Sequence, residues 1–566
     1  STPSRHRSAM AAFPSPCSCA SFHAVLVACG WDATMVDALR AHRVVVVGAG
    51  VAGLVSALLL ACRGLQVTLI ERAETPGGKM RRVVVDGAGV DSGPTVFTMR
   101  WVFEQIFEAA GSSLTEELRL QPLGVLARHA WGGDQRLDLH ADSARSADAI
   151  AQFAGPGEAR RFMRFCDQAR KVYDTLEGPY IRSQRPTMLS MARDLGPSGL
   201  GVLAGLGPFA SLWRSRARHF HDARLQQLFG RYATYCGSSP FAAPATLMLV
   251  AQVEMDGVWA VDGGMLAVAT TLAALAQKRG ATLRYGQACD EVLVRDGRAC
   301  GVRLEDGTCI DADSVVFNGD AAALSVGLLG DRARTAVPEI AASRRSLSAM
   351  TWSMHARTRG FPMVRHNVFF NSDYASEFRD IFQHARLPRE GTVYVCAQDR
   401  DDSGRLPPCD SDPDGSRAER LLCLVNAPAH GDSTPLEPSE IEACERTHFA
   451  LMKRSGLTID RQAHNTVITT PTGFHRLFPA TGGALYGQAS HGWMGVFQRP
   501  EAASRLPGLY LAGGSVHPGP GVPMAAMSGR LAAETLMAHL DSTNRSRRVH
   551  ISGGMSTRSA TTGNTR

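Results

Sequence analysis

The sequence of 566 residues predicts an α/β fold, with a Rossmann-like nucleotide-binding domain and an interleaved α+β domain. Residues 43–72 read as a strand, a glycine turn, a helix and a second strand that ends in an acid. Residues 508–537 read as a short strand, a turn rich in Gly and Pro, and an Ala-rich helix. Because the chain is longer than one ordinary domain, we expect the second domain to be built from residues between these two ends.

The first unit has the features of a dinucleotide site. Val44–Val47 have no polar residue between them, so this strand should be buried on both faces of a parallel sheet. Gly48 permits a tight turn, Gly50 lets the backbone approach a pyrophosphate, and Gly53 brings the helix close to the strand. Glu71, 23 residues after Gly48, is placed to accept hydrogen bonds from a ribose. The alternative is a turn with a purely structural role.

The residues after this acid indicate which dinucleotide binds. Gly77, Gly78 and Lys79 offer two glycines and a cation, which suit a second approach to phosphates that a nicotinamide site does not need. A surface turn with a solvated lysine is the alternative. Near the other end, the helix N-terminus at Val522 to Met524 would direct partial positive charge at a flavin ring.

These two units resemble the ends of the FAD-dependent phytoene desaturase and amine oxidase superfamily. Amine oxidases usually carry an acid where this chain has Gly514, whereas AGGSVHPGPGVP (512–523) is similar to the corresponding turn of bacterial carotenoid desaturases. Four further stretches resemble the 1-hydroxycarotenoid 3,4-desaturases of phototrophic bacteria: DSGPTVFTMRWVFEQIF, HNVFFNSDYASEFRDIF, LVNAPAHGD and LFPATGGALYGQASHGWM. The match extends from about residue 42 to about residue 540.

The resemblance implies that FAD is the cofactor and that the FAD-binding domain is assembled from three segments. These are 41–100, 251–320 and 479–541, with substrate segments 101–250 and 321–478 between them, a leader at 1–40 and a tail at 542–566. The expected FAD-binding residues are Gly48, Gly50, Gly53, Glu71, Gly78, Lys79, Gly514, Val522 and Met524, and by resemblance Val292 at the adenine. In 280–320, two Asp-Gly pairs between short strands predict a small antiparallel sheet.

Charge and cysteine usage exclude several other classes. The net charge is +7, but residues 545–566 alone hold five arginines and no acid, so the core is near neutral and a nucleic-acid partner loses its support. The 13 cysteines form no C-x-x-C pair, which argues against a disulfide framework or a zinc site and favours a reducing cytoplasm. We expect no metal.

Neither end of the chain carries a motif of the family. Residues 1–40 are interpreted as an unstructured leader from an upstream-extended reading frame, with Met35 as the natural start. A lipoprotein signal around VLVAC (25–29) is the alternative. The tail after about residue 541 is rich in Arg, Ser, Thr and Gly and is predicted to be disordered.

Residues 195–213 form an uncharged stretch of 19 residues, long enough to cross a bilayer. Five glycines and two prolines argue against a continuous spanning helix. The stretch is followed by a basic group: Arg214, Arg216, Arg218, His219 and His221. We therefore predict a segment that dips into one leaflet, and a cytoplasmic protein held peripherally at the inner or photosynthetic membrane. A helical hairpin inside the protein is the alternative.

The predicted reaction is a carotenoid desaturation. Oxidised flavin accepts a hydride at N5, a conjugated polyene spreads the positive charge that remains, and loss of a neighbouring proton completes the double bond. His517, in the turn beside the expected flavin, and Glu254 or Asp256 are the candidate proton acceptors, although a strut and a helix cap are the respective alternatives. An amine or protoporphyrinogen oxidase, or a non-catalytic flavin or carotenoid carrier, would share the fold.

The predicted substrate is an acyclic carotenoid with a tertiary hydroxyl at C1, taken from the bilayer and desaturated between C3 and C4. A general phytoene or neurosporene desaturase is the alternative. A buried hydroxyl needs a hydrogen-bond partner near one end of an apolar tunnel. The polar candidates in the family-like stretches are His366, Asn367, Asp373, Tyr374, Asn426 and His491.

Overall fold

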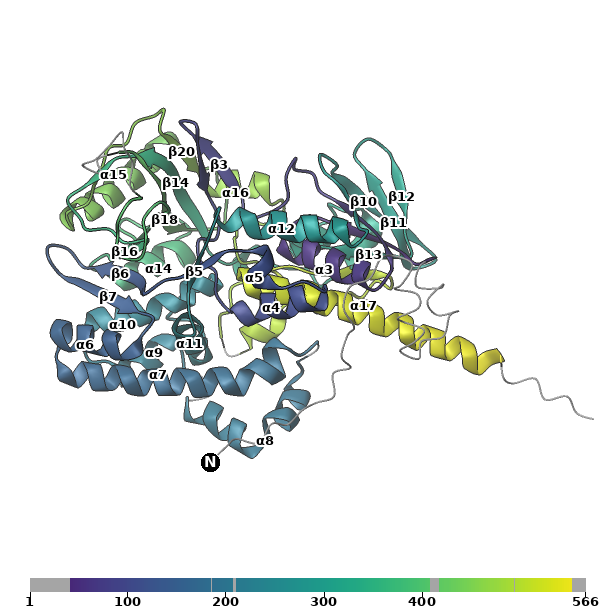
Figure 1. Cartoon of the computed structure of the whole chain (residues 1–566), viewed down its shortest axis with the longest axis horizontal. Helices are drawn as coiled ribbons and strands as arrows, with labels where there is room; N and C mark the ends of the chain where they lie inside the picture. Colours follow the sequence, from purple (N-terminus) through teal and green to yellow (C-terminus); the bar gives the residue numbers. More distant parts are fainter. Residues whose placement is uncertain (1–40, 185, 207–209, 408–416, 493, 552–566) are drawn as a thin grey trace, which may run out of the picture.

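The computed structural model describes residues 41–551, apart from 185, 207–209, 408–416 and 493. The leader 1–40, with Met35 and the VLVAC stretch, lies outside the described residues. Two lobes lie side by side in Figure 1, each built on its own sheet. The predicted α/β class with an interleaved second domain is confirmed.

A five-stranded parallel sheet forms the core of the first lobe. Its strand order is β21-β13-β1-β2-β9. The strands are β1 (Arg43–Val47), β2 (Gln66–Ile70), β9 (Thr282–Arg284), β13 (Ser314–Phe317) and β21 (Leu509–Leu511). Val44–Val47 are buried and pair with β2 on one side and β13 on the other, as the uninterrupted valines predict.

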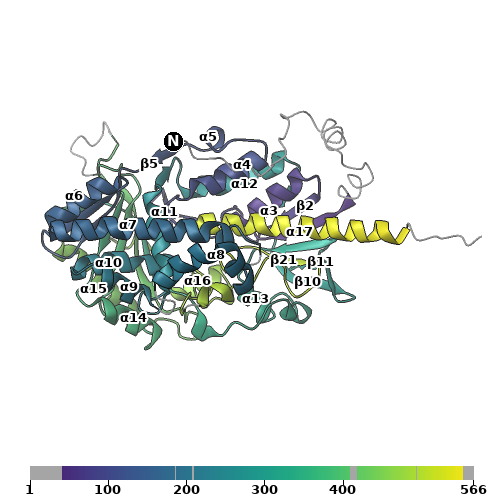
Figure 2. The ribbon, with the colours of Figure 1, turned by 90° about the horizontal axis from the view of Figure 1, so that it is seen from below.

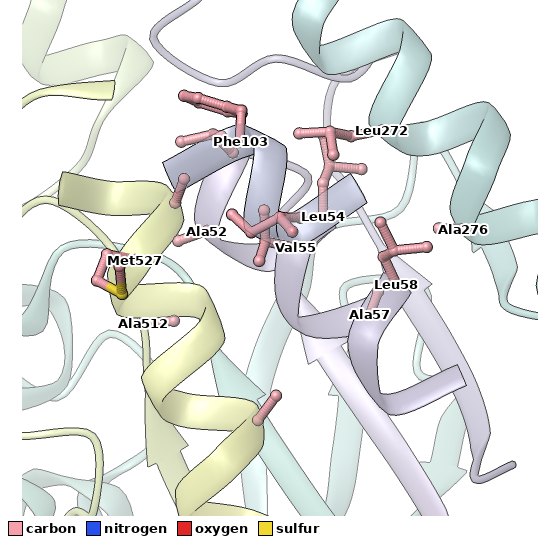
Figure 3. Close-up of a cluster of buried hydrophobic side chains, with 14 of the residues drawn as sticks. Ala52, Leu54, Val55, Ala57, Leu58, Phe103, Leu272, Ala276, Ala512 and Met527 are labelled. Carbon is pink, nitrogen blue, oxygen red and sulfur yellow. The ribbon is translucent and has the colours of Figure 1, made fainter. Parts of the chain in front are cut away.

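Three helices pack together against this sheet: α3 (Val51–Cys62), α12 (Met265–Lys278) and α17 (Val522–Ile551). Figure 3 shows α3 between the other two, with Leu58 directed toward α12 and Val55 toward α17. Small residues allow the close approach, since a Cβ on Gly529 would lie 2.2 Å from the Ala52 carbonyl oxygen. The Ser56 hydroxyl donates to the Gly529 carbonyl at 2.9 Å, which joins the two ends of the chain.

A three-stranded sheet stands beside the first, in the order β10-β11-β12. Its strands are β10 (Cys289–Arg295), β11 (Arg298–Leu304) and β12 (Cys309–Asp311), and both pairs are antiparallel, as predicted. Asp296 and Gly297 both have positive φ, 51° and 71°, which is the backbone that a two-residue hairpin turn requires.

The second lobe is built on a seven-stranded sheet in the order β20-β14-β18-β17-β16-β6-β7. Its strands are β6 (Val125–Ala130), β7 (Arg136–His140), β14 (Ser348–Ala356), β16 (His366–Phe369), β17 (Val393–Ala397), β18 (Glu419–Ala427) and β20 (Thr466–Thr469). Helix α15 (Pro438–Arg454) packs its Cys444 and Leu451 with the buried Trp352 of β14. The opposite face of the sheet is left for the cavity described below.

Helices and short turns close the lower side of the second lobe in Figure 1. They are α6 (Ser143–Ala154), α7 (Pro156–Leu176), η1 (Glu177–Ile181), α8 (Met188–Gly205), α9 (Leu212–His219), α10 (Ala223–Gly230), η2 (Arg231–Cys236), η3 (Ala245–Met248) and α11 (Leu249–Met255). Phe165, Phe220 and Phe229 pack ring against ring in their core, with centroids 4.7 to 5.3 Å apart.

The uncharged stretch 195–213 is divided between two helices. Gly196, at φ 60° and ψ −176°, interrupts α8, and Pro197 follows it. In Figure 1, α8 lies at the lower edge of the molecule below α7, and in Figure 2, seen from below, it faces the viewer beside α7. Within the described residues, no helix combines the length and the apolar composition needed to cross a membrane. Residues 207–209 and the side chains of Arg216 and Arg218 lie outside the description.

The C-terminal boundary is corrected by the structure. Helix α17 continues to Ile551, about ten residues past the predicted start of a disordered tail. One turn of this extension is tied to the helix where the Thr543 hydroxyl donates to the His539 carbonyl at 2.9 Å. Composition alone did not show that a long helix was already nucleated and could propagate into a polar segment. Residues 552–566 lie outside the described part.

The remaining elements connect the lobes or lie on their surfaces. They are β3 (Arg82–Val85), β4 (Ala88–Asp91), α4 (Arg100–Ala109), α5 (Leu114–Glu117), β5 (Leu120–Pro122), β8 (Trp259–Val261), α13 (Ala321–Ser325), η4 (Asp331–Ala336), η5 (Ala342–Arg344), β15 (Thr358–Arg359), α14 (Tyr374–Phe382), β19 (Thr458–Ile459), α16 (Pro471–Leu477) and η6 (Gly495–Gln498).

Candidate functional site

One cavity of about 930 Å³ extends from the loops of the five-stranded sheet to the face of the seven-stranded sheet. Glycine loops and the start of α17 line its first part. Strands β14, β16, β17 and β18, together with α11, line its second part. A volume of this size is in the range of ligand sites. We call the two parts the nucleotide half and the sheet half.

Two side chains, Glu71 and Asn318, form hydrogen bonds to the backbone of the first glycine loop, residues 48–53. The Glu71 carboxylate accepts the backbone N–H of Ala49 at 2.7 Å and that of Ala73 at 2.9 Å. The Asn318 amide donates to the Gly48 carbonyl at 3.1 Å, and a Cβ on Gly50 would lie 2.9 Å from the same amide nitrogen. Each carboxylate oxygen keeps a lone pair for a ribose hydroxyl. Sequence reasoning missed Asn318, whose only signal is its place directly after a buried strand.

The second pair of glycines lies against this loop. Gly77 donates its N–H to the Ala49 carbonyl at 2.9 Å, and a Cβ on Gly78 would lie 3.1 Å from the Gly50 Cα. Gly77 and Gly78 have φ of 130° and 57°, so both positions favour glycine. Their backbone therefore borders the nucleotide half at the point where a phosphate could approach.

Lys79 lies on the cavity, but its ammonium already has a partner. It donates to the Leu485 carbonyl at 2.6 Å, and burial lowers its pKa. The sequence predicts a cation that approaches phosphates, with a solvated surface lysine as the alternative, and the burial of Lys79 contradicts the alternative. The structure also uses this cation to join the glycine loop to the C-terminal segment, a contact across 406 residues of sequence.

The C-terminal turn completes the nucleotide half. Gly514, Val522 and Met524 line the cavity, so the free N–H groups at the start of α17 border it. The buried Arg499 guanidinium donates to the carbonyls of Tyr486 at 3.0 Å, Gln488 at 2.7 Å and Gly514 at 3.1 Å. Arg499 was not predicted from the sequence, because nothing local marks an arginine whose partners are backbone carbonyls.

Two of the predicted cofactor residues do not line the cavity. Gly53 acts through packing, since a Cβ there would lie 2.0 Å from the Gly48 carbonyl oxygen. Val292 is fully buried in the small sheet and donates its N–H to the Leu329 carbonyl at 3.0 Å. The cavity instead reaches the neighbouring Cys289 and Asp290. The side of the cavity where the resemblance places the adenine is therefore formed by residues near Val292 and not by Val292 itself.

His517 also lies off the cavity. It is 5% exposed, and its Nε2 donates to the Ser183 carbonyl at 2.9 Å. Burial lowers the pKa of the ring to about 4, so the ring is neutral near pH 7. This location contradicts the prediction that His517 accepts the proton, because the ring does not border the cavity. The ring instead connects the C-terminal turn to the helical region. Its Gly-Pro surroundings were equally compatible with this strut.

Glu254, the other predicted proton acceptor, does line the cavity. Its two oxygens accept the hydroxyls of Tyr232 at 2.7 Å and Tyr235 at 2.8 Å, and the Arg231 guanidinium lies 3.9 Å away. Arg231 also donates to the Tyr235 hydroxyl. The carboxylate is therefore held in a partly buried, charge-balanced group and does not cap a helix.

The sheet half combines apolar walls with a few polar side chains. Its apolar lining residues are Leu249, Val250, Val253, Val258, Val368, Leu422 and Leu424. Of the six candidates for hydroxyl recognition, His366, Tyr374 and Asn426 line the cavity. The others serve the fold, because Asn367 bonds to the backbone of Val364, Asp373 caps α14, and His491 accepts the N–H of Ser239.

The nucleotide half fits a flavin dinucleotide. At Gly50 and Gly78 the backbone approaches so closely that a Cβ atom would fill the space. Glu71, an acid placed to bind a ribose, lines the cavity beside them, and the N-terminus of α17 faces the same space. No cluster of metal-ligating side chains occurs in the described ranges.

Comparisons with known proteins agree with this geometry. The family model described as flavin containing amine oxidoreductase matches residues 51–537. A hydroxyneurosporene desaturase of Rubrivivax gelatinosus is 68% identical, over 94% of this chain and 99% of that protein. A hydroxyneurosporene desaturase of Cereibacter sphaeroides is 45% identical, over 89% and 99%. A zeta-carotene-forming phytoene desaturase of Myxococcus xanthus is 29% identical, over 88% and 94%.

Two solved structures share the fold. A redesigned putrescine oxidase aligns with a TM-score of 0.55 at 15% identity, over 88% of this chain and 99% of that one. An oxidoreductase of Methanosarcina mazei aligns with a TM-score of 0.54 at 16% identity, over 87% and 100%. At this level of identity the likeness concerns the fold alone.

Proposed function

The chain belongs to the flavin-containing amine oxidoreductase family, and we propose that it is an FAD-dependent desaturase of acyclic 1-hydroxycarotenoids that forms the C3–C4 double bond. The observation that carries the proposal is the 68% identity to a hydroxyneurosporene desaturase over nearly the whole of both chains. A single cavity that joins a nucleotide half to an apolar sheet half supports it, because a long apolar substrate and a dinucleotide must meet there.

The reaction removes a hydride and a proton from adjacent carbons and leaves a new carbon–carbon double bond. Bound FAD supplies the two-electron acceptor for the hydride. The apolar walls of the sheet half exclude water and hold the polyene along the cavity, which favours the reacting geometry.

The chain must also receive the proton. Glu254 is the candidate acceptor that borders the cavity, with Tyr232 and Tyr235 orienting its two oxygens. Arg231 balances its charge in this partly buried position. His517 is no longer a candidate because its ring lies off the cavity.

Turnover by the purified protein tests the proposal directly. FAD-loaded protein is incubated in liposomes with 1-hydroxyneurosporene, neurosporene or phytoene, and the product spectrum is read for a longer chromophore. We expect a red shift with the hydroxylated substrate at a higher rate than with the other two. Equal rates on all three would favour a general carotenoid desaturase. No carotenoid turnover together with oxidation of a polar amine would favour the amine oxidase class, as in the putrescine oxidase of similar fold.

We also propose peripheral contact with a membrane, from which the carotenoid is taken. Helix α8 lies at the lower edge of the molecule (Figure 1), and its Leu189 and Leu200 side chains are 83% and 44% exposed. Arg193 and Arg214 are exposed in the same region of the chain. Apolar groups beside cations suit an anionic lipid surface. We expect cosedimentation with anionic liposomes that high salt or detergent reverses.

A further inference from the structure

A continuous group of polar side chains, called here the polar wall, borders the sheet half of the cavity. Its members all line the cavity and come from five different elements or loops: Thr95, Arg231, Tyr235, Glu254, His366 and Tyr394. Arg231, Tyr235 and Glu254 bond to one another. The question is which atom of this wall is left for a ligand.

His366 is held in place through one of its two ring nitrogens. Its Nδ1 lies 2.7 Å from the Tyr394 hydroxyl, and that hydroxyl lies 2.7 Å from the Thr95 hydroxyl. The rings of His366 and Tyr394 are stacked, with centroids 6.1 Å apart. Both residues stand on neighbouring strands, β16 and β17, so the sheet fixes their orientation.

The second ring nitrogen, Nε2, has no hydrogen-bond partner among the described residues. His366 is 2% exposed, so bulk water does not supply one. Burial lowers the pKa of the ring to about 3, with the nearby Arg365 and Arg231 cations acting in the same direction. The ring is therefore neutral, and an unpaired nitrogen in such a place calls for a neutral hydrogen-bonding ligand.

We infer that His366 Nε2 binds the tertiary hydroxyl of the substrate and thereby selects hydroxylated over unhydroxylated carotenoids. A hydroxyl can donate and accept, so it suits either tautomer. If Tyr394 donates to Thr95, Nδ1 carries the proton and Nε2 accepts from the substrate. If Tyr394 donates to Nδ1, Nε2 donates to the substrate oxygen. The inference rests on the proposed function.

Two other cavity-lining groups, Asn426 and Thr351, could also contact the substrate hydroxyl. The Asn426 amide is already anchored, since it donates to the buried Glu377 carboxylate at 2.8 Å. The Thr351 hydroxyl is also without a partner among the described residues, and it lies on β14 of the same sheet. Thr351 therefore provides the matched control, because Thr351→Val removes an unpaired wall hydroxyl while keeping the volume.

The test compares His366→Phe with Thr351→Val and with the unaltered protein, all loaded with FAD. The measured quantity is the ratio of kcat/KM for 1-hydroxyneurosporene to that for neurosporene, together with the dissociation constants of both carotenoids. We expect His366→Phe to reduce the kcat/KM ratio by about 10-fold or more and to raise the ratio of the two dissociation constants by a similar factor, because only the hydroxylated substrate loses a contact. Thr351→Val should leave both ratios within about 2-fold, because in this inference the substrate hydroxyl bonds to His366 and not to Thr351.

His366→Gln restores a donor and an acceptor, so it should recover part of the preference. Tyr394→Phe is a positioning variant, and it should weaken the preference less than His366→Phe does. An unchanged ratio in His366→Phe, or a loss that occurs in Thr351→Val instead, overturns the inference. Absence of carotenoid turnover by the unaltered protein overturns the proposed function itself. If His366→Phe fails to bind FAD, the ratio measured in Tyr394→Phe decides.

Discussion

The two halves of the cavity differ in which atoms line them, mainly backbone atoms in one and side chains in the other. The nucleotide half is made of backbone: glycines at positive φ, carbonyl oxygens and the first N–H groups of α17. The sheet half is made of side chains from the adjacent strands β14, β18, β17 and β16. A site made of backbone has almost no room for an added side-chain atom. A site made of side chains can accept substitutions, and substrate selectivity is the first property that they reduce. This contrast predicts how strongly each half responds to mutation.

The largest effect is expected at the glycine loop. Gly50→Val would place a side chain within 2.9 Å of the Asn318 amide and in the space of the pyrophosphate, so flavin binding should be abolished. The flavin absorbance per protein measures this. Gly201→Ala, where a Cβ meets nothing within 4 Å, is the control and should keep its flavin. A yellow Gly50→Val protein with full occupancy would contradict the prediction.

The next effect is expected at Arg499. Arg499→Met leaves three carbonyls without their buried donor and should lower the free energy of unfolding by about 3 kcal/mol or more. The flavin dissociation constant should rise as well, because two of these carbonyls belong to loops at Tyr486 and Gly514 that line the cavity. Thermal unfolding and flavin release measure both quantities. A variant with unchanged Tm and flavin affinity would show that the loops hold without this arginine.

In the sheet half, Glu254→Gln should reduce kcat by about 100-fold and leave FAD content unchanged, if the carboxylate accepts the proton. Tyr232→Phe removes one hydroxyl that orients the carboxylate and should have a smaller effect. Single-turnover reduction of the flavin by substrate isolates the chemical step. A normal kcat in Glu254→Gln would show that another group or water accepts the proton.

The pH dependence of the free energy of unfolding tests whether His517 has a structural role. Its folded pKa, about 4, lies below the value near 6.5 of an unfolded histidine. Its contribution is therefore fully present above pH 6.5 and is lost as pH falls through 4, with a total on the order of 3 kcal/mol. His517→Gln retains a donor but does not titrate, so the free energy of unfolding should fall less between pH 6.5 and 4. An identical pH dependence would contradict the assignment.

The smallest effect is expected outside both halves, on α8. Leu189→Ser should weaken binding to anionic liposomes by a few-fold, since one exposed leucine contributes only part of a membrane contact. Turnover in detergent should stay the same. Val326→Ser, at an apolar side chain that is 51% exposed elsewhere, is the control. If both variants bind liposomes equally well, the contact lies on another surface.

Much of the fold was predictable because its signals are local. The valines of β1, the spacing of Gly48 to Glu71 and the Asp-Gly turn at 296–297 each specify a backbone geometry within a few residues. The glycines and the start of α17 also identify the nucleotide half for the same reason. The end of α17 was misjudged because helix propagation depends on the preceding turns more than on composition.

The sequence by itself determined the class of fold, the dinucleotide fingerprint and the resemblance to carotenoid desaturases. Only the tertiary structure decided which polar side chains border the cavity. His366 and Asn367 are neighbours in sequence, yet only His366 borders it, because successive residues of a strand point to opposite faces. His517 and Arg499 likewise owe their roles to partners far away in sequence, Ser183 and the carbonyls of two loops. Such contacts form only when strands and loops from distant segments pack together, and no local pattern encodes them.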